Sequence, residues 1–413
     1  MARSTIYAGL EIGTSKICVV VGEARSDGAI KILGVGQAPS RGVRKGEIVD
    51  FETARTCLHD ALVRAEERSD VMIKNVILSV TGPHIECLNN RGRLAIPEDQ
   101  SEITEEDLEE IKEIARDVAI PEQNVFLHSI VRHYIVDGQD KVINPVGMLG
   151  RKLEADYHII HGIRSRIQNT IRCVQEIPLE VEDVVFAPIA AAQIVLNKEA
   201  KEQGALLIDI GGGTTDYVLY ADGAVAQSGS IGLGGDHITN DLALVLKVPL
   251  SRAEKLKLEE GNCSQDPSAI EGRVMLEGDA QFVGRSVERE LLNGVIASRL
   301  TEIFELVLRR LEKGDGLGRC AAGVYLTGGT SLMPGVASLA EEILGLPVHR
   351  PSTAPISGLT ATFENPQYAT PIGLIRYAQI LENEKPRRSA FSKFAGKVGT
   401  FFSGVRLFGW LFS

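Results

Sequence analysis

The clearest pattern of apolar and polar positions lies in the middle of the chain, at residues 206–220. Large apolar residues lead into three glycines and two threonines, and a second β-prone run follows. This pattern predicts a hairpin with a polar tip. Glycines at such a tip let backbone N–H groups approach a phosphate, and hydroxyls add donors. Asp209 and Asp216 suit a hydrated Mg²⁺, which prefers oxygen ligands; an ordinary glycine-rich hairpin is the alternative.

The N-terminus repeats this pattern. Residues 6–12 predict a strand, 13–16 a hydroxyl-rich turn, 17–21 a returning strand and about 30–35 a third strand. The segment Glu11-Ile12-Gly13-Thr14 aligns with Asp209-Ile210-Gly211-Gly212. The sequence therefore predicts a duplicated chain, with two related α/β halves that each offer a phosphate-facing hairpin.

Further elements follow from helical and strand periodicity. Helices are expected at about 51–67, from 104, and at 166–176, 189–196, 238–246, 252–257 and 287–312. Strands are expected at 75–80, 93–96, 124–136, 153–160, 182–186 and 324–327. Asp50 and Ser251 are the predicted caps of two helices. The apolar stripe expected for the helix at 287–312 consists of Leu291, Val295, Ile296, Phe304 and Leu308.

Two of these regions have special roles. Strands and one acidic helix at about 84–163 interrupt the regular plan, which predicts a small inserted α+β subdomain that contacts other proteins. The strand at 324–327 ends in Gly328-Gly329 shortly before a helix near Pro334. Bare backbone at this position lets a flat ring or a phosphate lie close to the chain.

Composition narrows the possible functions. With 413 residues, the chain is too long for one hydrophobic core, so two to four domains are expected. A formal net charge of −11 argues against general nucleic-acid binding. The six cysteines lack a CxxC pair, which fits reduced thiols in a cytoplasm. His158 and His161 are expected to be surface or packing residues and not metal ligands. No signal peptide or transmembrane helix is predicted.

The last part of the chain has its own pattern. Residues 384–390 are polar and interrupted by proline, which is typical of a linker. Residues 391–413 carry basic residues among apolar positions at helical spacing, and predict an amphipathic helix that lies in a membrane interface and binds anionic lipid. A core or domain-docking helix is the alternative. The expected membrane-facing aromatic residues are Phe391, Phe394, Phe401, Phe402, Phe408, Trp410 and Phe412.

The phosphate motifs resemble those of the actin, Hsp70 and sugar-kinase superfamily. Within it, the chain is most similar to the FtsA family of actin-like cell-division proteins, through Lys45-Gly46, the insertion, residues 234–239 and the amphipathic tail. The fold class expected is therefore α/β: a duplicated actin-like ATPase fold with an inserted α+β subdomain and a C-terminal amphipathic helix. The resemblance divides the chain into IA (1–83, 164–197 and 362–383), IC (84–163), IIA (203–230 and 302–361) and IIB (231–301).

The resemblance also implies the site residues. Nucleotide phosphates would lie between Gly13, Thr14, Ser15 and Lys16 on one side and Gly211, Gly212, Gly213, Thr214 and Thr215 on the other. Glu254 and Lys257 would reach the ribose and adenine, and Gly328 and Gly329 would lie behind the base. Glu11 and Asp209 would face Mg²⁺, directly or through water. From spacing alone, Glu254 and Lys257 are equally well explained as a surface ion pair.

The function implied is that of an ATP-binding protein that forms filaments and tethers FtsZ to the cytoplasmic face of the inner membrane at the division site. The FtsZ C-terminal tail would bind near Arg285, Arg289 and Arg299 in IIB, and later division proteins would bind IC. Solvated arginines on an amphipathic helix are the alternative for those three residues.

Hydrolysis is expected to be weak, and whether the protein is an enzyme stays open. Glu11 stands where most members of the superfamily have Asp, and Gln193 is the one residue of the connecting helix able to orient water. A small-molecule kinase of the same superfamily is the alternative function, but no motif supplies its general base. An Hsp70-like chaperone would need a β-rich substrate domain, which the sequence does not predict.

Overall fold

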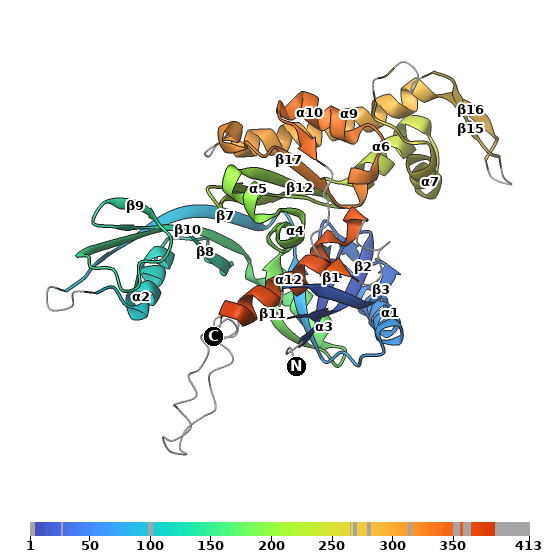
Figure 1. Ribbon diagram of the computed structural model, residues 1–413. Coiled ribbons are helices and arrows are strands. Elements are labelled where there is room, and N and C mark those ends of the chain that lie inside the picture. Colours follow the sequence, from blue (N-terminus) through green and yellow to red (C-terminus); the bar gives the residue numbers. More distant parts are fainter. Residues whose placement is uncertain are drawn as a thin grey trace.

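The computed structural model describes residues 5–25, 28–97, 102–264, 266, 271–278, 282–312, 316–349, 356–357 and 365–384. Two α/β halves lie against each other, and a smaller sheet extends to one side (Figure 1). The predicted membrane-binding helix at 391–413 lies outside the described residues, as does the predicted linker except for Glu384, which ends a helix. No helix among the described residues is long and apolar enough to cross a membrane.

The first half is built on a six-stranded sheet. Its strands, in spatial order, are β11 (Glu180–Phe186), β6 (Asn75–Val80), β1 (Thr5–Ile12), β2 (Lys16–Ala24), β3 (Ile30–Pro39) and β19 (Ile356–Ser357). Helices α1 (Phe51–Ser69) and α3 (Arg164–Gln175) pack together beside this sheet. Helices α4 (Ala187–Val195) and α12 (Ala369–Glu384) form a second contacting pair. Asp50 caps α1 by accepting from the Thr53 N–H, as predicted.

The second half repeats the order of the first. Its strands are β14 (Ala224–Ile231), β13 (Thr215–Ala221), β12 (Ala205–Ile210), β17 (Val324–Thr327) and β18 (Val348–His349). Both halves pair a hairpin strand antiparallel to its neighbour and parallel to a later strand, β1 with β6 and β12 with β17. Among the described residues, this half contains the helices α5 (Lys198–Gln203), α6 (Gly235–Leu246), α7 (Leu250–Glu260), α9 (Arg289–Leu311) and α10 (Val336–Leu344). The predicted duplication is confirmed.

In its described residues, the insertion consists of a four-stranded sheet and one helix. Its strands are β7 (Ile85–Ala95), β10 (Lys152–Ile163), β8 (Asn124–Val136) and β9 (Gln139–Val142), and its helix is α2 (Glu105–Arg116). Thr104 and Asp107 form a capping box at the start of α2. The insertion has its own buried core, which includes Ile111, Leu153 and Ile159.

Side chains of the insertion cover the outer edge of β14. Asn89 Nδ2 donates to the Ala226 carbonyl at 3.0 Å, and Cys87 Sγ donates to the Ser228 carbonyl at 2.8 Å. The fully buried His158 bridges Asn89 Oδ1 at 2.7 Å and Ser228 Oγ at 2.8 Å. His158 is therefore a packing residue, as predicted, and it joins the insertion to the second half. His161 is also buried, against Asn124.

Several local predictions were wrong. Ser251 does not cap a helix, because α7 begins at Leu250, two residues before the predicted start, and Ser251 lies within it. The helix predicted from 287 begins at Arg289, after the short strand β16 (Arg285–Glu288), which pairs with β15 (Arg273–Leu276). Leu291 is 47% exposed, and its neighbour Leu292 is buried instead. Both α5 and β9 were missed, since six and four mostly polar residues carry little periodicity.

Candidate functional site: a cavity between the two halves

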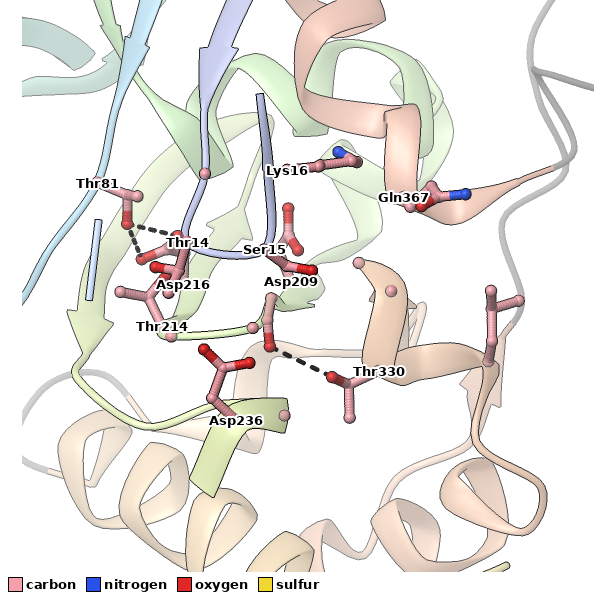
Figure 2. Close-up of a pocket in the computed structure, with 18 of the residues that line it drawn as sticks. Thr14, Ser15, Lys16, Thr81, Asp209, Thr214, Asp216, Asp236, Thr330 and Gln367 are labelled. Carbon is pink, nitrogen blue, oxygen red and sulfur yellow. Dashed lines mark hydrogen bonds between the residues drawn. The ribbon is translucent and has the colours of Figure 1, made fainter. Parts of the chain in front are cut away.

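A cavity of about 430 Å³ lies between the halves, within the size range of small-molecule sites. The tips of both hairpins line it, together with the glycine pair that follows β17 and residues of α6 and α7. Figure 2 shows Thr14, Ser15 and Lys16 opposite Asp209, Thr214 and Asp236. Asp216, which the sequence matched to a hydrated Mg²⁺, also lines the cavity. The lining residues that the sequence did not assign to the site are Ile12, Ser79, Thr81, Ala187, Gly235, Asp236, Leu258, Thr330, Leu332, Met333, Pro334 and Gln367.

The two hairpin tips are closed in the same way. The Gly13 N–H donates to the Lys16 carbonyl at 2.9 Å, and the Gly211 N–H donates to the Thr214 carbonyl at 2.9 Å. The tips approach so closely that a Cβ on Gly213 would lie 2.4 Å from Thr14 Oγ1. Glycine at this position therefore permits contact between the two halves at the polar end of the cavity.

Helix α6 begins directly on the second hairpin. The Gly235 and Asp236 N–H groups donate to the carbonyls of Gly211 and Gly212 at 2.9 and 2.8 Å. Lys257 Nζ donates to the Gly235 carbonyl at 3.1 Å, which ties α7 to the same point. Any movement of the hairpin tip is therefore transmitted to the start of α6 and to α7.

The lysines of the cavity are each paired with an acid. Lys16 Nζ lies 2.8 Å from Glu11 Oε2, and Lys257 Nζ lies 2.6 Å from Glu254 Oε2. Burial opposes the charge of Lys16, but the Glu11 carboxylate raises the pKa of Lys16 above its usual value. Glu254 and Lys257 thus form an ion pair, but Lys257 is buried, so the pair does not lie on the surface as the alternative predicted; both residues line the cavity.

Two aspartates at the cavity are held in unfavourable surroundings for negative charge. Burial and the neighbouring Glu11 and Asp216 raise the pKa of Asp209 to about 7. Burial raises the pKa of Asp216 to about 6, although hydroxyl donors oppose the shift. Thr81 Oγ1 donates to Asp216 at 2.6 Å (Figure 2). A cation placed near these carboxylates would relieve their mutual repulsion.

The residues fit a hydrated magnesium ion better than a directly bound one. Within the described part of the chain, no three His, Cys, Asp or Glu side chains lie close enough together to hold a metal. Acidic oxygens nevertheless surround the cavity at Glu11, Asp209, Asp216 and Asp236. Mg²⁺ binds in this manner beside nucleotide phosphates, because it keeps several waters and takes one or two carboxylates.

Most of the predicted site residues come together at this cavity. It is lined by Glu11, Gly13, Thr14, Ser15, Lys16, Asp209, Gly211, Gly212, Gly213, Thr214, Glu254, Lys257, Gly328 and Gly329. Thr215 is not a lining residue: it is fully buried and donates to the Leu233 carbonyl. Gln193 also lies elsewhere, where it donates to Ile189 and accepts from Lys201.

Topology could have revealed one of the missed residues. Thr81 follows β6, which lies parallel to β1, so both strands end at the same edge as the first hairpin tip. Asp236 lies in a segment already singled out for its family resemblance. Gln367 belongs to no motif that the sequence could reveal. A short 3₁₀ turn at Pro366–Tyr368 brings it to the cavity.

The three arginines predicted for peptide binding do not form one cluster. The Arg285 guanidinium, on β16, donates to the Leu246 carbonyl, and Arg289 pairs with Glu260 at 2.7 Å. Arg299 binds both oxygens of Asp241, at 2.6 and 3.0 Å. Of the three, Arg299 lines a groove of about 620 Å³ between α6 and α9, beside the exposed Leu244 and Leu291.

Duplicated α/β halves with paired hairpins facing one cavity define an actin-like ATPase fold. Solved structures share this fold. The PilM-PilN type IV pilus biogenesis complex matches with a TM-score of 0.62 at 17% identity, covering 91% of this chain and 98% of that chain. MreB5 of Spiroplasma citri bound to ADP matches with a TM-score of 0.51 at 17% identity, covering 92% and 96%.

Sequence comparisons define the family. The profile described as "Cell division protein FtsA" matches residues 206–373, and that of the "SHS2 domain inserted in FTSA" matches residues 82–161. Cell division protein FtsA of Neisseria meningitidis serogroup B is 36% identical, over 92% of this chain and 91% of the relative. That of Pseudomonas aeruginosa is 37% identical, over 90% and 89%. The chain belongs to the FtsA family of actin-like cell division proteins.

Proposed function

We propose that this chain binds ATP with Mg²⁺ in the cavity between its halves and uses the nucleotide as a switch for assembly at the division site. The observation that carries the proposal is the meeting of two equivalent hairpins, from duplicated halves, at one cavity of about 430 Å³. Gly328 and Gly329 supply bare backbone on another wall. MreB5 of the same fold is bound to ADP, which supports a nucleotide as the ligand.

Each side of the cavity has a distinct part in this proposal. Both hairpin tips would hold phosphates, and the pair Glu254–Lys257 would meet the ribose and the base. Asp209 and Glu11 would face the waters of Mg²⁺, and the ion, when bound, supplies positive charge to the phosphates and to the crowded carboxylates. We expect slow hydrolysis at most, because Gln193 is held by Ile189 and Lys201 away from the cavity.

Equilibrium dialysis with ATP and with ADP, with Mg²⁺ or with a chelator, tests the nucleotide site directly. We expect saturable binding of one nucleotide per chain that strengthens with Mg²⁺. Absence of binding under all four conditions would refute the proposal. Turnover that requires an added small metabolite would instead favour a kinase of the same fold.

We propose further that the chain forms filaments and tethers FtsZ to the cytoplasmic face of the inner membrane, in the septal ring, through residues 391–413. Three basic residues and no acidic residue in this segment support attraction to anionic lipid. Full-length protein should sediment with vesicles containing anionic lipid and lose that binding in high salt. Deletion of 391–413 should release the protein while ATP binding persists; unchanged sedimentation would exclude this segment as the tether.

The FtsZ tail is proposed to bind the groove between α6 and α9, where Arg299 lies beside exposed apolar side chains. An acidic peptide group would compete with Asp241 and Glu302 for the Arg299 guanidinium. Arg299→Ala should therefore weaken binding of an FtsZ tail peptide at least fivefold. Arg309→Ala is a matched control, because Arg309 lies on the same helix and pairs only one turn away, with Glu305. Equal effects of both substitutions would argue against the groove.

The insertion is proposed to bind later division proteins. Its exposed Ile143 and Leu149, 93% and 69% accessible, lie in the segment after β9 and supply apolar surface for such contacts. Replacing both by Ser should weaken capture of later division proteins without changing nucleotide binding. The subdomain boundaries assigned from the resemblance, including 84–163 for the insertion, are part of this proposal.

A further inference from the structure

The turn Lys45-Gly46 joins two very short strands, β4 (Val43–Arg44) and β5 (Glu47–Ile48). Both turn residues have positive φ, 52° for Lys45 and 75° for Gly46. A two-residue hairpin turn of this kind favours Asn or Gly at its first position, because other side chains are strained there. A lysine at this position therefore disfavours the turn locally, which suggests that its side chain has another use.

The turn lies directly behind the polar end of the cavity. The Gly46 N–H donates to Thr14 Oγ1 at 3.0 Å, and a Cβ on Gly46 would lie 2.8 Å from Thr81 Cγ2. Thr14 and Thr81 both line the cavity. Lys45 is thus the residue before Gly46, which is hydrogen-bonded to the tip of the first hairpin.

The side chain of Lys45 reaches the second half of the molecule. Its Cδ lies 3.3 Å from the point where a Cβ on Gly232 would be. Gly232 precedes α6, which begins on the second hairpin. After burial, the positive charge of Lys45 is the largest influence that lowers the pKa of His237, in the first turn of α6. Lys45 therefore extends from the first half toward the start of α6, the helix that begins on the second hairpin.

Acidic side chains outnumber basic side chains around the cavity. Among the described residues, its lining includes five carboxylates, at Glu11, Asp209, Asp216, Asp236 and Glu254, but only two lysines. Lys16 is paired with Glu11, and Lys257 with Glu254. A nucleoside triphosphate carries several negative charges into these surroundings, and Mg²⁺ offsets only part of them. Lys45 is half-buried, and its ammonium has no acceptor among the described residues.

We propose that Lys45 binds the terminal phosphate of a nucleoside triphosphate and makes the cavity distinguish a triphosphate from a diphosphate. The proposal rests on the nucleotide site proposed above. Because the stem of Lys45 lies against Gly232, a phosphate held by its ammonium draws the first half and the start of α6 together. A diphosphate lacks the group that Lys45 contacts, so its binding does not depend on this lysine.

The test compares ADP with the slowly hydrolysed analogue AMPPNP, both with Mg²⁺, by calorimetry on the full chain. Lys45→Asn removes the charge and introduces a residue that the turn favours, so the fold is retained or stabilised. We expect AMPPNP affinity to fall about tenfold or more, the size of one charge-assisted hydrogen bond, and ADP affinity to change less than twofold. Lys45→Arg should restore part of the preference.

A control variant and the unmodified chain show whether a change in affinity comes from Lys45 or from the nucleotide site as a whole. Lys74→Asn changes the same charge at an exposed position of the same half and should leave both affinities unchanged. If the Lys45→Asn variant loses AMPPNP and ADP equally, or loses neither, the role of Lys45 is refuted while the nucleotide site stands. If the unmodified chain binds neither nucleotide, both proposals fail. Thermal unfolding of each variant confirms that the fold is intact.

Discussion

His158 offers a sharp test of how the insertion is attached, because its ring lies fully buried between the insertion and β14. Since Asn89 Oδ1 is an acceptor, the ring donates from Nδ1 and accepts the Ser228 hydroxyl at Nε2. Replacement by Gln can keep one of these bonds but not both. Loss of one bond, with a buried partner left unsatisfied, costs about 1–3 kcal/mol.

The pH dependence of this cost follows from the buried ring. Burial lowers the pKa of His158 to about 3, whereas an unfolded histidine titrates near 6.5. Below pH 6.5 the unfolded or detached state binds the proton that the native state refuses, so stability is lost as pH falls. At pH 5 the loss is about 2 kcal/mol, since each pH unit corresponds to 1.36 kcal/mol. The Gln variant has no such loss.

Hydrogen exchange of the β10 and β14 amides, corrected for intrinsic rates, measures the local opening free energy. At pH 7.5 the His158→Gln variant should open more easily than the unmodified protein by about 1–3 kcal/mol. At pH 5 the difference should shrink by about 2 kcal/mol or vanish. His133→Gln, at a partly exposed position of the same sheet, is the matched control. A difference that is equal at both pH values would refute the reasoning.

Three further substitutions test the cavity. Asp209→Asn should remove most of the Mg²⁺ dependence of nucleotide binding, measured as the affinity ratio with and without a chelator, because it removes one proposed ligand charge. Gly329→Leu should abolish nucleotide binding while thermal unfolding is unchanged, since a Cβ there meets no protein atom within 4 Å; Gly318→Leu is the control at an equally open glycine. Gly213→Ala should cost about 1–3 kcal/mol in stability, because its Cβ would lie 2.4 Å from Thr14 Oγ1; unaltered denaturation would show that the hairpin tips separate freely.

The sequence was sufficient for the paired hairpins because their information is local. Glycines and hydroxyls at the two tips, after apolar strands, determine both the turn and the chemistry, and Glu11 and Asp209 fall at matching positions of β1 and β12. Helix α1 was equally predictable, since Asp50 and the apolar residues at Ala54 and Leu58 lie within one segment. The duplication followed from comparing such segments and needed no tertiary contact.

The missed features depend on contacts between distant segments. Thr215 has the sequence signature of a phosphate donor, but the Leu233 carbonyl, 18 residues away, takes its hydroxyl. Arg299 has the signature of a free cation on a helix, but α6 supplies Asp241 opposite it. Gln367 reaches the cavity only because the chain returns there after the second half is complete. Periodicity contains no information about such partners.

Strand β14 contacts both the insertion and residues that line the cavity. At one end, Ser230 pairs with Asp216 across the sheet, and both lie beside Thr81. Two residues earlier, and therefore on the same face, the Ser228 hydroxyl donates to His158. The backbone carbonyl of Ser228 accepts from Cys87 Sγ. We therefore expect a ligand that changes the charge around Asp216 to act on β14, the strand that contacts the insertion. Ligand binding in the cavity would therefore affect the insertion by changing the free energy with which the insertion is held against β14.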